Sequence, residues 1–276
     1  MSGHVRVLAL LGRLRSGSHN RQLAEAAVEP ALEGVGVTLN EALAEVSLSD
    51  ADIDTDEQRP ARPMSEAWAR ILAMTATAAD YRWFGERFPD LAEAYCFTLV
   101  HNLPPSHLLG RLGGRTESSR TGTAATVDAA FDLLGRSDNA RQFIAMTTVG
   151  DWTLLIEPNG CLGVGEEKAL PASAGTRWIS HFVDINGRDS FLWAEDTAKR
   201  LMFEPGLPDH RWGTTPDELL DAMHHSGFQF WDETSDTAEF LATEAAFALA
   251  EHLTGVRVTP ELLRDTTFVC GSTEIG

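Results

Sequence analysis

The first sixty residues follow the pattern strand, loop, helix, strand. Residues 5–11 form a continuous apolar run, which is typical of a strand covered on both faces of a sheet. Residues 20–29 are rich in helix formers, and residues 34–43 contain a second strand-like run. A helix between two strands predicts a βαβ unit with parallel strands.

A linker is expected after this unit. Residues 49–63 are acidic, contain two prolines and show no hydrophobic periodicity, as in a loop. Residues 64–79 have a helix-like pattern and are expected to join the two parts of the chain. We therefore predict a small domain at 1–62, a linker helix at 63–79 and a larger domain at 80–276.

The larger domain opens with helix-like spacing. Between residues 80 and 103, apolar side chains recur at intervals of three and four: Tyr81, Phe84, Phe88, Leu91, Tyr95 and Leu99. This predicts an amphipathic helix, bent near Pro89. Residues 106–114 predict a short helix ended by glycines, and the polar stretch 115–126 is expected to be a mobile loop.

The middle of the larger domain is rich in strand signals. Residues 151–164 predict a strand followed by a Pro-Asn-Gly turn. Residues 176–196 contain two alternating runs around Asn-Gly, which predicts a β-hairpin, and residues 199–205 add a further strand. Together they predict an antiparallel meander of about four strands.

Helices are expected again at the end of the chain. In residues 215–227, Thr215 and Glu218 form a capping-box pattern around Pro216. Residues 236–255 start in a similar way, and residues 259–265 begin a third helix. The prediction is α+β overall: an incomplete βαβ unit followed by a larger α+β domain whose antiparallel meander is flanked by helices.

Composition narrows the function classes. The formal net charge of −19 argues against nucleic acid as a main partner and against anionic membranes. No apolar run is long enough to span a bilayer and no signal peptide is seen, so a cytoplasmic protein is expected. Cys96, Cys161 and Cys270 are far apart, which indicates neither a disulfide framework nor a zinc site.

The loop at residues 12–20 has the chemistry of a phosphate site. Gly12 allows a sharp exit from the strand, and Gly17 lets backbone N–H groups approach an anion closely. Ser18 and Asn20 offer donors at a helix N-terminus, where free N–H groups attract anions. Arg15 supplies a positive charge.

This loop resembles that of the NADPH-dependent FMN reductase family, which is flavodoxin-like and carries G-S-x-R-x-G-S-x-N after its first strand. The resemblance extends to about Arg62. It implies FMN binding, NAD(P)H-dependent flavin oxidoreductase activity and these phosphate-binding residues: Gly12, Arg15, Ser16, Gly17, Ser18 and Asn20. Arg13 departs from the family pattern. No loop for the flavin ring is found after Met64, and a doubly wound sheet needs about five strands, so the half-domain is incomplete.

Residues 80–276 resemble an actinobacterial domain family of unknown function, in stretches such as 80–100 and 180–196. The resemblance implies no activity, so single residues have to be weighed. His181, Glu204 and His210 offer metal-ligand chemistry at spacings that match no known pattern, and a core histidine with a surface Asp–Arg pair is the simpler interpretation. No metal is therefore expected.

Four tryptophans lie in or near the predicted strands, either as core residues or as part of an exposed patch for a protein partner: Trp152, Trp178, Trp193 and Trp212. Two hypotheses follow. The chain is an FMN reductase-like oxidoreductase, incomplete in its flavin site, or residues 80–276 form a non-catalytic protein-interaction domain behind a vestigial flavodoxin-like segment. Translation starting at Met64 or Met74 in place of Met1 is a variant of the second hypothesis.

Overall fold

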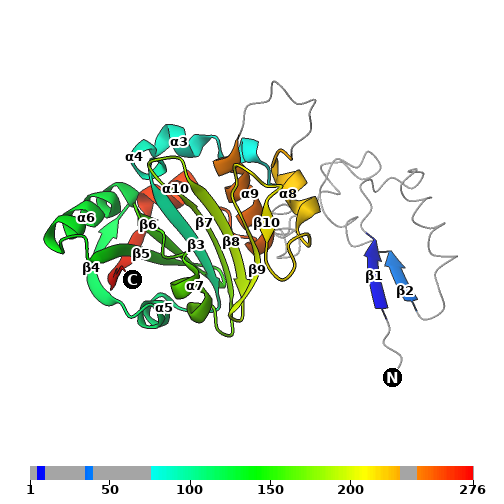
Figure 1. The fold of residues 1–276 in the computed structure, drawn as a ribbon, viewed down its shortest axis with the longest axis horizontal. Coiled ribbons are helices and arrows are strands. Elements are labelled where there is room, and N and C mark those ends of the chain that lie inside the picture. The colour runs from blue at the N-terminus through cyan, green and yellow to red at the C-terminus, as the bar shows by residue number, and fades with distance from the viewer. Residues whose placement is uncertain (1–4, 10–34, 40–75, 231–240, 276) are drawn as a thin grey trace, which may run out of the picture. The chain divides into compact units, whose positions relative to one another are not determined.

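The computed structural model describes residues 5–9, 35–39, 76–230 and 241–275 (Figure 1). The chain divides into two units, Met1–Trp68 and Ala69–Gly276, which we treat separately. In the first unit, β1 (Val5–Ala9) and β2 (Val35–Leu39) pair in parallel. Parallel pairing was predicted for these two strands. The helix predicted between them and most of the 63–79 linker lie outside the described residues.

The described part of the second unit contains one antiparallel sheet with the strand order β10-β9-β8-β7-β3-β6-β5-β11-β4. The strands are β3 (Tyr95–His101), β4 (Arg115–Thr121), β5 (Arg141–Val149), β6 (Trp152–Pro158), β7 (Arg177–Val183), β8 (Asp189–Glu195), β9 (Ala198–Phe203), β10 (Arg211–Trp212) and β11 (Thr267–Glu274). An α+β domain with an antiparallel sheet is confirmed. The predicted meander of four strands was too small, because β3 lies between β6 and β7 and the sheet has nine strands.

Helices cover both faces of the sheet (Figure 1). On the first face, a large apolar core includes side chains from η2 (Ala78–Tyr81), α3 (Trp83–Arg87), α4 (Pro89–Ala92), α6 (Thr123–Arg136), α8 (Leu220–Ser226), α9 (Ala242–Thr254) and α10 (Pro260–Asp265). On the second face, a smaller core includes side chains from α5 (Pro105–Arg111) and α7 (Glu166–Ala172). Since successive strand residues point to opposite faces, each central strand contributes side chains to both cores.

The prediction of an amphipathic helix over residues 80–103 is confirmed for the helical segments on either side of a break at Pro89, α3 and α4, and is wrong from Tyr95 onward. Pro89 opens a new short helix, and Tyr95–His101 is the central strand β3. Residues 95–100 are all buried because the sheet is covered on both faces. A strand of this kind has no alternation of apolar and polar residues, so its large side chains matched a helical spacing by chance.

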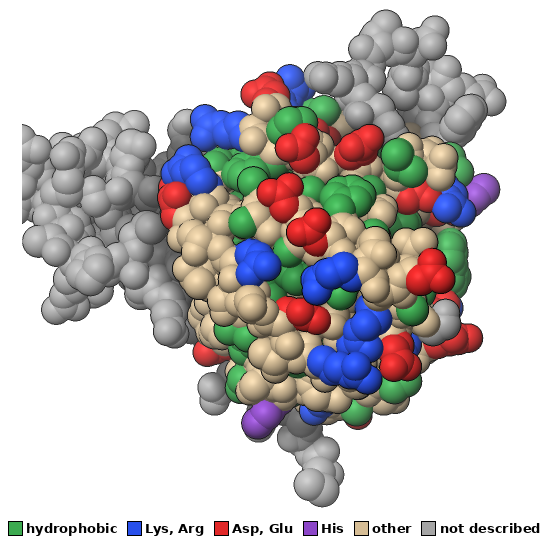
Figure 2. Space-filling view, turned by 90° about the vertical axis from the view of Figure 1, so that its left-hand side faces the viewer, with side chains coloured by type: hydrophobic (Ala, Val, Ile, Leu, Met, Phe, Trp, Pro, Cys, Tyr) green, Lys and Arg blue, Asp and Glu red, His purple; other side chains and the backbone are tan. Residues whose placement is uncertain are grey.

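The mobile loop predicted at 115–126 was also wrong. It forms β4, an edge strand, and the first turn of α6. Most of the β4 side chains are exposed, so the strand has no apolar alternation to reveal it. Figure 2 shows this side of the molecule, where acidic and basic side chains are interspersed with polar ones.

The predicted closing helices are partly confirmed. The 259–265 prediction corresponds to α10, and the Thr259 hydroxyl accepts a hydrogen bond from the N–H of Leu262 at 3.2 Å. The helix predicted from Thr215 begins only at Leu220. The Glu218 carboxylate, expected in a capping box, instead accepts a 2.7 Å hydrogen bond from Arg200.

Candidate functional site

The predicted phosphate loop lies outside the described residues. This applies to all six of its expected FMN ligands: Gly12, Arg15, Ser16, Gly17, Ser18 and Asn20. Their role in FMN binding stays a prediction.

An aromatic centre lies on the first face of the sheet, around His181 of β7. The imidazole is buried, stacks on Phe97 with 5.7 Å between ring centroids, and meets the edge of Phe247 at 4.3 Å. Its Nδ1 lies 3.5 Å from the hydroxyl of Tyr95. Burial lowers the pKa of His181 to about 3, so the ring is neutral at physiological pH. The core histidine favoured by the sequence is confirmed.

A small cavity adjoins this histidine. It has a volume of about 10 Å³ and is lined by His181, Phe97, Phe247 and aliphatic side chains that include Val256 and Val258. A volume of this size is at the lower limit for a single water molecule. The cavity therefore offers His181 no room for an organic substrate.

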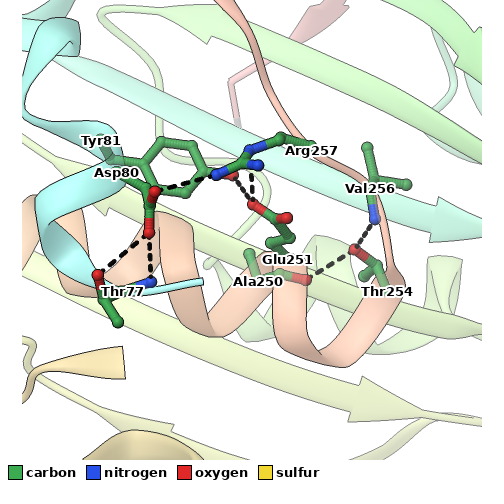
Figure 3. A network of polar contacts seen from close by, with 8 residues as sticks. All are labelled: Thr77, Asp80, Tyr81, Ala250, Glu251, Thr254, Val256 and Arg257. Carbon is green, nitrogen blue, oxygen red and sulfur yellow. Dashed lines mark hydrogen bonds and ion pairs between the residues drawn. The ribbon is translucent and has the colours of Figure 1, made fainter. Parts of the chain in front are cut away.

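A polar network lies beside the cavity, where the C-terminal part of α9 meets η2 (Figure 3). The Tyr81 hydroxyl donates a 2.5 Å hydrogen bond to the buried Glu251 carboxylate. Arg257 lies 3.6 Å from Glu251 and 3.2 Å from Asp80, which in turn accepts a hydrogen bond from the N–H of Thr77 at 2.9 Å. Burial raises the pKa of Glu251. Since these groups bind one another, the network ties η2 to α9.

A second enclosed carboxylate, Glu157, lies on the opposite face. Its two oxygens accept 2.8 Å hydrogen bonds from the N–H groups of Leu162 and Gly163, and burial raises its pKa to about 7. The Trp178 indole N–H donates to the Gly163 carbonyl at 2.8 Å. A Cβ at Gly163 would lie 2.1 Å from Oγ1 of Thr98, so the loop is pressed onto the sheet. Glu157 therefore anchors the loop that follows β6.

The weaker metal hypothesis joined His181, Glu204 and His210. His181 lies in the core, whereas Glu204 and His210 are exposed in the segment after β9. Within residues 76–230 and 241–275, no three His, Cys, Asp or Glu side chains are grouped to hold a metal ion. The Arg211 side chain forms its ion pair with Asp217, at 2.8 Å.

Exposed apolar side chains lie on neighbouring segments near the β10 edge of the sheet. Ile185 in the β7–β8 turn, Leu207 in the β9–β10 segment and Trp212 on β10 are 69%, 49% and 41% exposed. Met202 is half-buried and lies directly opposite Trp212 in the β9–β10 pair. We call these four residues the Trp212 corner. The other three tryptophans weighed above, in contrast, are buried: Trp152, Trp178 and Trp193.

The Asp189 carboxylate holds this corner together, because it accepts a 2.8 Å hydrogen bond from the N–H of Gly206. This bond places the β9–β10 segment against the start of β8, next to the turn that carries Ile185. Burial, with a contribution from the negative charge of Glu204, raises the pKa of Asp189 to about 6. The corner thus contains two neighbouring carboxylates.

Acidic side chains dominate the surroundings of the corner. Residues 184–189 and 204–212, at the β7–β8 turn and the β9–β10 segment, contain four Asp and Glu and two Arg. Both of these cations are in ion pairs: Arg188 with Asp184 and Arg211 with Asp217. The field at this end of the sheet is therefore negative.

Only weak signals for these groups are present in the sequence. Glu157 ends an otherwise apolar strand run, and a lone carboxylate there indicates a buried anchor. The exposure of Ile185, Leu207 and Trp212 carried no such signal, because it depends on which strands form the sheet edge.

In the described part of the chain, no helix has the length and apolar composition needed to cross a membrane.

Comparison with known proteins adds one finding. The model of a protein family described as "Family of unknown function (DUF6461)" matches residues 74–275. No curated protein and no solved structure matches the chain.

Proposed function

The chain belongs to the DUF6461 family of unknown function, and from the geometry of its domain we propose that it is a non-catalytic protein-interaction domain that binds a partner through the Trp212 corner. The observation that carries this proposal is the concentration of exposed apolar side chains there. Of the six large hydrophobic side chains exposed in the described residues, three belong to this corner: Ile185, Leu207 and Trp212. Exposed large hydrophobic side chains on adjoining segments favour a binding surface in this part of the domain.

Tryptophan is the residue type that most favours this interpretation. It is enriched among the few interface residues that provide most of the binding energy. Trp212 presents its indole beside Met202, whose flexible thioether adapts to different partner surfaces. Exposed polar residues of the same segment, Glu204, Asp209 and His210, accompany these apolar side chains, and an apolar centre with a polar rim is the usual anatomy of an interface.

The enclosed polar groups support a structural role over a catalytic one. His181 is neutral and adjoins a cavity of about 10 Å³. Glu157 and Glu251 are committed to internal donors at 2.8 Å and 2.5 Å. A general acid or base has to come within hydrogen-bond reach of its substrate. These three side chains are instead buried and contact other groups of the same domain.

The proposal is tested by site-specific photo-crosslinking in the native host. A benzophenone amino acid replaces Trp212 in one variant and Phe131 in the matched control. Phe131 is 56% exposed and lies on α6, away from the corner. We expect one discrete crosslinked partner, identified by mass spectrometry, from position 212 and none from position 131. Identical products from both positions, or none from 212, would contradict the proposal.

A second candidate function is FMN binding by the first unit. It is supported by the parallel pairing of β1 and β2, which is the pairing that a phosphate loop between two strands requires. When bound, FMN would supply hydride chemistry through its ring, and residues 12–20 would hold its phosphate. Titration of the full chain with FMN tests this candidate. Flavin fluorescence quenching that is lost in Arg15→Ala supports it, and no change at millimolar FMN refutes it.

A further inference from the structure

The charge of the domain restricts what can occupy the Trp212 corner. Residues 74–275 contain 30 Asp and Glu and 15 Lys and Arg. Two copies meeting at this corner would bring their acidic surroundings together, and like charges across an interface are unfavourable. A second copy of the chain is therefore disfavoured, and so is any acidic partner.

The corner also has acidic side chains next to its apolar ones. Glu204 is exposed and directly follows β9, and Asp189 lies close enough to sense its charge. The nearby cations are held in ion pairs: Arg188 by Asp184 at 2.5 Å, Arg200 by Glu218 at 2.7 Å and Arg211 by Asp217 at 2.8 Å. Among the described residues, no lysine or arginine forms an ion pair with Glu204, so an incoming cation would meet this carboxylate directly.

Two buried tryptophans of the chain already contact arginine side chains through their ring faces. The guanidinium of Arg177 lies 4.9 Å from the centroid of Trp152, and that of Arg200 lies 4.9 Å from the centroid of Trp193. Both are cation–π geometries. Trp212 is the exposed tryptophan beside this acidic surface, and an external Arg or Lys would find the same type of contact there.

We propose that the partner segment bound at the Trp212 corner is a cationic peptide segment, with an apolar side chain against Trp212 and Met202 and with flanking Arg or Lys side chains directed to Glu204 and the Trp212 ring. This inference rests on the proposed function and names the chemistry of the partner. The apolar contact supplies affinity, whereas the charges supply association rate and specificity.

Selection from a random peptide library tests the inference without knowing the natural partner. Phage-displayed twelve-residue peptides are selected on the immobilised full chain, after removal of phage that bind Trp212→Ala. We expect the enriched peptides to carry net positive charge around one or two apolar residues. Enriched peptides that are neutral or acidic would overturn the inference and leave the proposed function standing. No enrichment over the Trp212→Ala chain would contradict both.

Affinity measurements with an enriched peptide separate the two contributions. Calorimetry is carried out with wild type, Trp212→Ala, Glu204→Gln and the control Phe131→Ala, each checked for a native circular-dichroism spectrum. We expect about tenfold weaker binding for Trp212→Ala, about threefold for Glu204→Gln and no change for Phe131→Ala. Affinity should also fall as salt is raised. Binding that is insensitive to both salt and Glu204→Gln would refute the cationic contact.

Discussion

The buried carboxylate of Glu157 should make the domain less stable as the pH rises. Burial raises its pKa to about 7 from an ordinary value of 4.5. The folded chain therefore keeps this proton to a higher pH than the unfolded chain, so the free energy of unfolding falls as the pH rises through this window. One pKa unit corresponds to about 1.4 kcal/mol, which gives about 3 kcal/mol in total and about 2 kcal/mol between about pH 5.5 and pH 8.

Substitution Glu157→Gln removes this titration. The amide oxygen can accept from only one of the two N–H groups that Glu157 now binds, those of Leu162 and Gly163, so a baseline loss of about 1–3 kcal/mol is expected at all pH values. The informative quantity is the change in the free energy of unfolding with pH, because the baseline loss does not affect it. Urea unfolding followed by tryptophan fluorescence should show a pH-dependent loss about 2 kcal/mol smaller in the variant than in wild type.

Glu261→Gln is the matched control for this measurement. Its side chain is 65% exposed on α10, so this substitution makes the same carboxylate-to-amide change at the surface and supplies the reference slope. The lower pH stays above the sequence isoelectric point of about 4.8, where net charge keeps the chain from precipitating. Equal slopes for wild type and Glu157→Gln would refute the reasoning.

Three further perturbations test the interior. His181 has a folded pKa of about 3 against an ordinary value of 6.5, so the unfolded chain binds the proton first and the free energy of unfolding falls on acidification. His181→Phe should remove about 1 kcal/mol of the loss between about pH 6.5 and 5.5, measured by urea unfolding. An unchanged loss would count against the buried neutral histidine. Gly163→Ala should destabilise the domain by about 1–3 kcal/mol in thermal unfolding, because its Cβ meets the sheet. The control Gly135→Ala, which has open space around it in α6, should stabilise the domain by about 0.5 kcal/mol. Equal effects of the two substitutions would show that the loop after β6 can move. Tyr81→Phe removes the hydrogen-bond donor to Glu251 and should lower the free energy of unfolding by about 1–3 kcal/mol, measured by urea unfolding at neutral pH. An unchanged free energy of unfolding would mean that the network does not hold η2 to α9.

Local signals in the sequence were sufficient for the parts of the fold that depend on neighbouring residues. The Asn-Gly dipeptide at 186–187 places the β7–β8 hairpin, and the Thr259 cap places α10. Both features arise from backbone requirements within a few residues. These elements were accordingly predicted with the right type and position.

The sheet order could not be predicted, because it depends on contacts between distant segments. β11 lies near the end of the chain and pairs with β4 and β5, although more than a hundred residues separate it from them. The burial of β3 follows from cores on both faces, which removed the alternation that identifies a strand. The Trp212 corner has the same origin, since the β9–β10 segment adjoins the start of β8 only in the folded sheet, through the bond from the Gly206 N–H to Asp189.

The most direct test of an interaction through the Trp212 corner is the dissociation constant for the partner identified by crosslinking. Isothermal titration calorimetry should be carried out with the full chain as wild type, Trp212→Ala and the control Phe131→Ala. We predict that Trp212→Ala binds at least about tenfold more weakly, equivalent to about 1.4 kcal/mol, while Phe131→Ala binds like wild type. Equal dissociation constants for wild type and Trp212→Ala would contradict binding through this corner.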